Sequence, residues 1–237
     1  MTGSTSVHPG ADRFRVVPWR GRGEVVLIAP VPGAAPPGPE GVRHCVDALA
    51  RRGVREVVTG ALAPAEQPAF LAAGFDVREH LHLLAHDLRD LPVPSRPVRL
   101  RRGRRSDRPA VLDVDRLAFE EFWRLDDVGL TDALEATLAS RFRIAGDRRP
   151  VGYAVTGRAG PRGYLQRLAV RPDHHGRGIA ATLVADGLRW LRRHGCESAA
   201  VNTQHRNVTA LAVYEHLGFR RQPEGLVVLS RTVGPPG

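Results

Sequence analysis

The sequence predicts an α/β fold, and two observations support this prediction. Between Tyr164 and Gly195 a short apolar strand, closed by Pro172, turns through glycines into a helix with apolar residues at helical spacing. The order strand–helix–strand occurs in both halves of the chain. We therefore expect two α/β domains, and 237 residues are enough to bury a core in both.

The N-terminal domain is expected over residues 13–90, after a disordered tail at 1–12. Apolar runs bounded by Gly and Pro predict its strands, and helical periodicity that stops at a glycine predicts its helices. The expected strands are 24–29, 54–62 and 77–88, and the expected helices are 42–52 and 64–73. A loop is expected at 30–41, which is too rich in Pro and Gly for a helix.

A linker is expected at 91–97, because three prolines lie between Asp90 and Pro97. The second domain, which carries the chemistry, is then expected over 98–237. Its expected strands are 98–101, 141–145, 150–156, 164–170, 198–204 and 226–232, and its expected helices are 107–118, 131–140, 179–194 and 207–217.

All 35 basic residues of the chain are arginine, and the formal net charge is +10. Such a charge could attract nucleic acid or an anionic cofactor. The densest cluster, Arg99–Arg105, is short and contains no aromatic residue, so a solvated linker and strand edge is the preferred interpretation. A nucleic-acid binder is kept as an alternative that a binding assay at varied salt would test, but no nucleic-acid partner is expected.

The two cysteines, Cys45 and Cys196, lie far apart without the spacing of a metal site or a disulfide framework. We expect both to be buried apolar residues, and we expect no metal. The chain has no apolar run of about eighteen residues, and its first residues lack the apolar core of a secretion signal. A cytoplasmic protein without a membrane partner is therefore expected.

The turn from strand to helix at 175–180 has the chemistry of an anion site. Gly176 and Gly178 allow the backbone to approach a ligand closely, and the first N–H groups of a helix have no partners within it. A diphosphate suits such a helix start. The sequence HGRGIA matches neither the P-loop GxxxxGK[ST] nor a GxGxxG fingerprint with its later acidic residue.

Two stretches resemble the GCN5-related N-acetyltransferase (GNAT) superfamily. Residues 175–180, preceded by Val170-Arg171-Pro172, are similar to its motif A, (Q/R)xxGx(G/A), with His175 in place of Gln or Arg. Asn207–Phe219 is similar to its motif B, and Asn207 and Gly218 would begin and end that helix. The resemblance covers residues 97–232 and implies the GNAT fold, a mixed and mostly antiparallel sheet flanked by helices.

The resemblance also implies acetyl-CoA as the cofactor. The backbone at 176–180 would hold its diphosphate, and the strand before it would lie beside the pantetheine arm, since in this family that strand and the next splay apart. The implied coenzyme-binding residues are Leu168, Ala169, Val170, His175, Gly176, Arg177, Gly178, Ile179, Ala180, Asn207 and Ala210. Helix capping alone would explain Asn207, and solvation alone would explain the side chains of His175 and Arg177.

Tyr214 is the general acid that the resemblance implies, close to the coenzyme sulfur, and packing in the core is the alternative. The general base stays open. Asn202 stands where related protein N-terminal acetyltransferases often carry a glutamate, and an amide cannot take the proton. A water chain could substitute, or one of four carboxylates: Glu120, Glu121, Asp126 and Asp127.

The segment at 119–127 falls where the family builds the wall of its acceptor site. Phe119, Phe122 and Trp123 could line a pocket there, and Asp126 or its neighbour could attract a cationic amine. The alternative is a core-packed helix end with solvated acids.

The N-terminal domain resembles a degenerate partial copy of the same fold. Phe70–Phe75 aligns with Tyr214–Phe219, but no equivalent of HGRGIA is present, and Phe70 has no hydroxyl to donate. We therefore expect this half to be catalytically inactive; an unrelated small α/β cap is the alternative.

Taken together, the sequence predicts an acetyl-CoA-dependent N-acetyltransferase that acts on a peptide or protein N-terminus or on a small-molecule amine. The alternative from another class is a non-catalytic acyl-CoA-binding sensor with the same fold. A monomer or homodimer is expected. The identity of the acceptor lies beyond the sequence.

Overall fold

The computed structural model describes residues 5–7, 14–20, 22–31, 35–147 and 149–234. The chain divides into two compact units. Unit 1 comprises residues 1–82 and 223–237, and unit 2 comprises residues 83–222. Each unit is described by itself.

Unit 1 has a sheet with the strand order β1-β2-β3-β4-β12-β5. The pair β3–β4 is parallel, and the other recorded pairs of this unit are antiparallel. Its elements are β1 (Thr5–Val7), β2 (Phe14–Trp19), β3 (Arg22–Pro30), α1 (Pro39–Ala50), β4 (Glu56–Leu62), η1 (Pro64–Glu66), α2 (Pro68–Ala72), the first part of β5 (Asp76–His86) and β12 (Leu226–Thr232). The helices α1 and α2 bury Val42, Val46 and Phe70 against apolar residues of this sheet.

Unit 2 has the strand order β10-β9-β8-β7-β6, and β11 pairs with the end of β5. Only β9–β10 is parallel among its recorded pairs. Its elements are β6 (Leu100–Arg102), η2 (Arg105–Asp107), α3 (Arg108–Ala118), η3 (Glu121–Trp123), α4 (Asp127–Glu135), β7 (Ala139–Ala145), β8 (Gly152–Ala159), β9 (Arg162–Val170), η4 (Pro172–His174), α5 (Ile179–Arg193), β10 (Ser198–Gln204), α6 (Val208–His216) and β11 (Arg220–Arg221). The predicted mixed, mostly antiparallel sheet is therefore confirmed.

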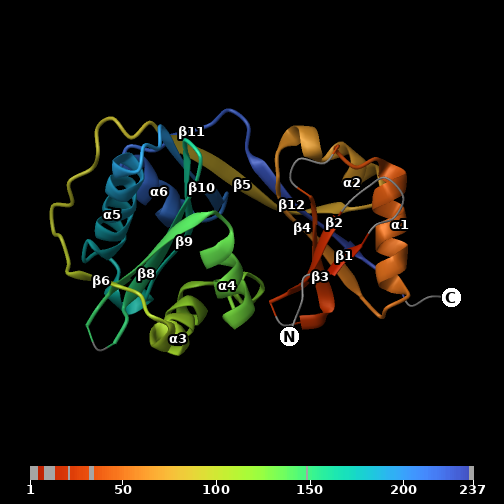
Figure 1. Cartoon of the computed structure of the whole chain (residues 1–237), viewed down its shortest axis with the longest axis horizontal. Helices are drawn as coiled ribbons and strands as arrows, with labels where there is room; N and C mark the ends of the chain where they lie inside the picture. The colour runs from red at the N-terminus through yellow and green to blue at the C-terminus, as the bar shows by residue number, and fades with distance from the viewer. Residues whose placement is uncertain (1–4, 8–13, 21, 32–34, 148, 235–237) are drawn as a thin grey trace. The chain divides into compact units, whose positions relative to one another are not determined.

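The sheet of unit 2 lies between two pairs of helices (Figure 1). On one face, α3 and α4 bury Val111, Val114 and Leu130 against β7, β8 and β9. On the other face, α5 and α6 bury Leu188 and Tyr214 in a second core with residues of β10. Apolar side chains at helical spacing on each helix account for these two layers.

The two units share local geometry as well as element order. In α1 and α5 the chain leaves the helix through a glycine with positive φ, Gly53 and Gly195. The ring of Phe70 packs against Phe75 at 5.5 Å in unit 1, as the ring of Tyr214 packs against Phe219 at 5.7 Å in unit 2. These paired features support the interpretation of unit 1 as a copy of the same fold.

Several predicted elements differ from the structure. The expected helix at 64–73 is two short pieces, because Pro68 starts α2 anew and has no N–H to continue the first turn. The expected helix at 131–140 begins earlier, at Asp127, and residues from Ala139 onward extend β7. The strand β2 was not predicted, since its apolar residues are interrupted by Arg15 and Pro18.

Strand pairing is recorded for residues near both ends of the chain. The closing strand β12, expected in the second domain, pairs with β4 and with the first part of β5 in unit 1. Most of the expected tail at 1–12 lies outside the described residues, and the three that are described form β1. The proposed domain boundaries therefore remain a prediction.

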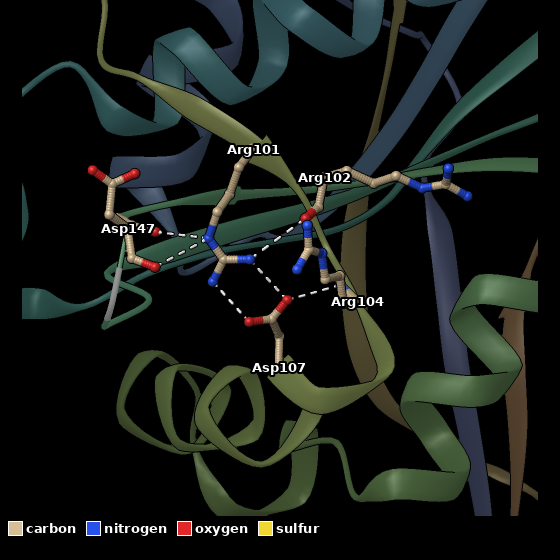
Figure 2. Close-up of polar contacts among 6 residues, drawn as sticks. Arg101, Arg102, Arg104, Asp107 and Asp147 are labelled. Atoms are coloured by element: carbon tan, nitrogen blue, oxygen red, sulfur yellow. Dashed lines mark hydrogen bonds and ion pairs between the residues drawn. The ribbon is translucent and has the colours of Figure 1, made fainter.

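One arginine of the cluster at 99–105 is structural rather than solvated. Figure 2 shows Arg101 of β6 reaching Asp107 before α3, with Nη1 and Nη2 donating to the two carboxylate oxygens at 2.8 and 2.7 Å. Its Nε donates to the main-chain oxygens of Gly146 and Asp147. This two-point ion pair joins the edge strand, the start of α3 and the turn after β7.

Both cysteines are buried and free, as expected. Burial raises the pKa of the Cys45 thiol to about 11, so this thiol is unreactive at neutral pH. Among the described helices, none has the length and apolar character needed to cross a bilayer. The described residues also contain no group of three or more His, Cys, Asp or Glu that could hold a metal ion.

The imidazole of His86 is buried at the end of β5. Its Nδ1 accepts a hydrogen bond from the Leu88 N–H at 2.9 Å, and its ring packs edge-on against Phe219 at 5.2 Å. Burial lowers the pKa of His86, and the opposing charge of Asp87 offsets this only in part. The fold therefore favours the neutral ring.

We expect the free energy of unfolding to decrease as the pH falls below about 6.5, because the unfolded chain then binds a proton that folded His86 resists. His86→Asn keeps an acceptor for Leu88 but does not titrate, so its stability should change less over the same pH range. Denaturant unfolding at several pH values measures this, and His216→Asn, at an exposed position, is the control. Parallel pH profiles for wild type and His86→Asn would contradict the assignment.

Candidate active site

The start of α5 presents a row of main-chain donors. Within the described part of the chain, no acceptor is recorded for the N–H groups of residues 176–181, and the first helical bond runs from Thr182 N–H to the Gly178 oxygen. Gly178 precedes the helix with a φ of 77° and no side-chain cap. Because unpaired N–H groups and the helix dipole both favour negative charge, this end can hold an anion.

The two glycines of this turn have different constraints. A Cβ on Gly178 would lie 2.5 Å from the main-chain oxygen of Arg96, so only glycine fits there. A Cβ on Gly176 would meet nothing within 4 Å, although its φ of 72° still favours glycine. The space next to Gly176 is therefore open to a ligand. The residue that follows the expected linker is tied to α5, since Val98 N–H donates to the Thr182 hydroxyl.

The side chains of the turn contact one another. The His175 Nε2 lies 3.0 Å from the Val170 oxygen, and Arg177 donates to the main-chain oxygen of Asp173. Hydrogen bonds from Arg171 and then His174 lower the pKa of the exposed Asp173 to about 2. The carboxylate of Asp173 is thus paired with Arg171, and its charge opposes an anionic ligand less than an unpaired acid would.

The strand β9 leaves its parallel neighbour β10 early. The two pair only at Arg162–Tyr164 with Ser198–Ala200, whereas β9 continues to Val170 and β10 to Gln204. The edge of β9 over 165–170 is therefore free to bind an extended ligand through its main chain. In unit 1 the equivalent pair β3–β4 stays in register as far as Ile28 and Thr59, close to the end of β3.

A β-bulge in β9 lies where the pairing with β10 has ended. Val155 of β8 faces Arg167 and Thr156 faces Leu165, so Gln166 is the extra residue. The bulge places Gln166 and Arg167 on the same face of the sheet: Gln166 reaches Thr137 after α4, and Arg167 reaches Asp115 of α3. Side chains of β9 can thus reach the helices on this face at two successive positions.

Tyr214, the predicted acid, is 6% exposed and lies in the core between α5, α6 and the sheet. Burial raises the pKa of its hydroxyl far above the usual value, and the charge of Arg167 opposes this shift. The raised pKa keeps the hydroxyl protonated at neutral pH, and it also makes the hydroxyl a weaker acid than that of an exposed tyrosine. Asn207 caps α6, with its side-chain oxygen 3.0 Å from the Ala210 nitrogen, so its amide NH₂ is the group left for a ligand.

A buried ion pair joins α3 to β9. Asp115 is fully buried, and its two oxygens accept from Nε and Nη2 of Arg167, both at 2.8 Å. The same carboxylate accepts from the Tyr153 hydroxyl at 2.5 Å and the Leu125 N–H at 2.7 Å. Four donors on one carboxylate compensate for its removal from water. Burial is also the main reason that the pKa of Tyr153 is raised.

Arg167 connects this pair to the expected acceptor wall. Its Nη2 donates to the Trp123 main-chain oxygen at 2.7 Å, and its guanidinium carbon lies 3.5 Å from the centre of the Phe119 ring. The ring of Phe122 packs edge-on against Trp123 at 4.9 Å. The structure thus places Phe119 and Trp123 against Arg167 of β9, the residue that precedes the predicted coenzyme-binding residue Leu168, and places Phe122 against Trp123.

The acidic residues of the wall have other contacts. Asp126 caps α4 by accepting from the Gly129 N–H at 2.7 Å, Asp127 pairs with Arg108, and Glu120 pairs with Arg206 at 2.8 Å. Asn202 is exposed on the part of β10 that has left β9. No described carboxylate therefore stands out as the general base, and its identity stays open.

Sequence reasoning missed Asp115, Arg167 and Tyr153. The signal was present: Asp115 follows Val111 and Val114 on the buried face of its helix, and Arg167 interrupts the apolar run of β9. A charged residue on a core-facing position predicts a buried partner. Two such interruptions within one domain could have been matched to each other.

Comparison with known proteins identifies the family of this part of the chain. The model of the "Acetyltransferase (GNAT) family" matches residues 108–219. The N-alpha-acetyltransferase MAK3 of Arabidopsis thaliana is 40% identical over 60 residues, 25% of this chain and 32% of the relative. A mycothiol acetyltransferase of Salinispora arenicola is 32% identical over 196 residues, 72% of this chain and 63% of the relative. The chain thus spans less than two thirds of either relative.

A solved structure matches almost the whole chain. It is a tandem GNAT protein from the clavulanic acid biosynthesis pathway, with a TM-score of 0.68, 14% sequence identity, and coverage of 96% of this chain and 80% of that protein. At this identity the match shows the fold alone. It agrees with the GNAT-like geometry of unit 1.

The buried ion pair gives a prediction for stability. Asp115→Ala leaves the Arg167 guanidinium buried without its carboxylate, and we expect a loss of about 3–5 kcal/mol in the free energy of unfolding. Urea unfolding measures this loss. Asp113→Ala, at an exposed position of the same helix, is the control and should change stability by less than about 0.5 kcal/mol.

The double variant Asp115→Asn with Arg167→Gln removes both charges and should recover part of the lost stability. If Asp115→Ala were as stable as the control, the ion pair would not be a main support of this layer.

Proposed function

Because residues 108–219 belong to the acetyltransferase (GNAT) family, we propose that this chain is an acetyl-CoA-dependent N-acetyltransferase. It would move an acetyl group to the primary amine of a peptide or protein N-terminus or of a small molecule. The observation that carries this proposal is the free edge of β9 over 165–170, which leads directly into the open amide row at the start of α5. The two features together suit a ligand with an extended arm and a diphosphate.

The residues of unit 2 divide into three roles in this proposal. The coenzyme supplies an activated acetyl thioester when it is bound. The amides of residues 176–181, which have no recorded acceptor within the described part of the chain, would bind its diphosphate. Main-chain groups of Leu168, Ala169 and Val170 on β9 would hold the arm, and one of their N–H groups would donate to the thioester oxygen. The wall at 119–126 orients the amine.

Tyr214 completes the chemistry. The nitrogen lone pair of a neutral amine attacks the carbonyl carbon, a C–N bond forms and the C–S bond breaks. The Tyr214 hydroxyl would donate its proton to the departing sulfur, the amine would lose its proton to solvent, and Tyr214 would regain a proton from solvent before the next turnover.

Incubation of the protein with acetyl-CoA and a library of amines and peptides tests this function directly. Thiol release together with a product heavier by one acetyl group is the expected result. Coenzyme binding without thiol release for any member of a broad library would instead favour the acyl-CoA sensor.

A variant at Gly176 tests the diphosphate cradle. Gly176→Glu places a carboxylate in the open space beside the amide row, and we expect coenzyme A to bind at least about tenfold more weakly by calorimetry. Gly195→Glu is a matched control, because its φ of 76° is similar, its Cβ is also unobstructed, and it lies at the other end of α5. If Gly176→Glu and Gly195→Glu bind coenzyme A with equal affinity, the coenzyme does not bind at the amides of residues 176–181.

A variant at Tyr214 tests the acid. Tyr214→Phe should lower turnover by about 10²-fold or more, as expected for a lost general acid, and should leave the affinity for coenzyme A within about twofold. Steady-state thiol release and calorimetry measure the two quantities. Tyr164→Phe, on the paired part of β9, serves as the control. Unchanged turnover would leave Tyr214 with a packing role only.

A further inference from the structure

Arg167 has hydrogen-bonding capacity that the protein does not use. Its Nε and Nη2 make three hydrogen bonds, to both oxygens of Asp115 and to the main-chain oxygen of Trp123. Its Nη1, with two N–H groups, has no acceptor among the described residues. The side chain is 12% exposed, so a mostly buried cation retains two donors and a small accessible surface.

The position of Arg167 links it to the acceptor rather than to the coenzyme diphosphate. It immediately precedes Leu168 on β9, and the bulge at Gln166 turns it to the face covered by α3 and α4. There it stacks on the Phe119 ring and contacts the main chain at Trp123. Both residues belong to the wall at 119–126.

The charges of this wall favour an acceptor with an oxygen ligand. Asp126 caps a helix, and Asp127 and Glu120 each pair with an arginine. Asp126 and Asp127, the carboxylates expected to attract a cationic amine, therefore each have a hydrogen-bond or ion-pair partner within the protein. A guanidinium held in place by a buried acid can donate its remaining N–H groups to a carbonyl or carboxylate oxygen, and a polyamine has no such oxygen to accept them.

We propose that Arg167 is a specificity-determining residue of the acceptor site, and that its Nη1 binds a carboxylate or carbonyl oxygen next to the reactive amine. The preferred acceptors are then α-amino acids or peptide N-termini, in which such an oxygen lies two bonds from the carbon that bears the nitrogen. Polyamines are disfavoured. This inference rests on the acetyl transfer proposed above.

Binding to the full chain saturated with coenzyme A tests the inference without turnover. The probes are phenylalanine, which has a carboxylate; phenylalaninamide, which has only a carbonyl; phenethylamine, which has neither; and spermidine, a polycation. Calorimetry should show phenylalanine or phenylalaninamide binding at least about tenfold more tightly than phenethylamine and spermidine, the size expected for one charge-assisted hydrogen bond. Tighter binding of phenylalanine than of phenylalaninamide would indicate an amino-acid acceptor, and the reverse order would indicate a peptide acceptor.

Arg167→Lys keeps a positive charge for Asp115 but removes the surplus donors. We expect this variant to bind phenylalanine and phenylalaninamide about tenfold more weakly than the wild type does. Its affinities for phenethylamine and coenzyme A should be unchanged. Arg141→Lys is the matched control, because Arg141 makes the same kind of two-point pair with Asp186 on α5. The double variant Asp115→Asn with Arg167→Gln removes the buried charges together and should lose the same preference.

Three results would overturn the assignment. One is equal binding of all four probes, or of none, by the wild type. The second is a loss in Arg167→Lys that is equal for phenethylamine and phenylalanine, which would indicate a structural role. The third is tighter binding of spermidine than of phenylalanine.

Thiol release separates this inference from the function on which it rests. If phenylalanine binds through Arg167 but acetyl-CoA is not consumed, acetyl transfer fails and the assignment of Arg167 stands. If spermidine is acetylated and the phenylalanine series is ignored, acetyl transfer stands and the assignment of Arg167 fails. In turnover assays the effect of Arg167→Lys should appear in KM for the oxygen-bearing acceptors rather than in kcat.

Discussion

The ion pair between Asp115 and Arg167 is the constraint on which the geometry of unit 2 depends. A fully buried carboxylate is strongly destabilising unless several donors replace water, and here the guanidinium, the Tyr153 hydroxyl and the Leu125 N–H do so. Those donors come from three places: β9, β8 and the loop before α4. The carboxylate therefore fixes the loop that carries Phe119 and Trp123, the proposed acceptor wall, relative to Arg167 of the strand that precedes the helix start.

Two irregularities of one strand produce the site. The bulge at Gln166 turns Arg167 toward α3, and the loss of pairing after Tyr164 exposes the other edge of the same strand. A regular β9 paired along its whole length would offer neither. Unit 1 shows the contrast, because β3 and β4 stay in register almost to the end of β3 and Phe70 replaces the tyrosine. In the described part of unit 1, β3 therefore leaves only its last two residues beyond the recorded pairing with β4.

Local patterns predicted the parts of the site that local chemistry determines. The glycines at 176 and 178, the N-cap at Asn207 and the core periodicity of α5 are all readable from neighbouring residues, and the structure has each of them. The splay and the bulge depend on contacts between residues distant in sequence, and no local pattern specifies them. A charged residue at a buried position predicts that Asp115 has a partner, but the residues near it do not say that the partner is Arg167. Asp126 was not predicted as a cap because the helix was expected to begin at 131, and the structure shows that it caps α4, which begins at Asp127.

Three arginines of this lysine-free chain make ion pairs that a lysine could not make in the same way. Arg101, Arg141 and Arg167 each bind one aspartate through two nitrogens, and all three pairs tie a strand to a helix or its start. A lysine ammonium group could balance the charge of the aspartate but could not donate to both carboxylate oxygens in one plane. Arg167 in addition stacks on the Phe119 ring and donates to the Trp123 main-chain oxygen, which a lysine could not do at the same time. Part of the positive charge that suggested nucleic acid is thus neutralised inside the fold. At Arg167 the two N–H groups of Nη1 remain, and these are directional donors. They suit the recognition of a single oxygen more than the attraction of a polyanion.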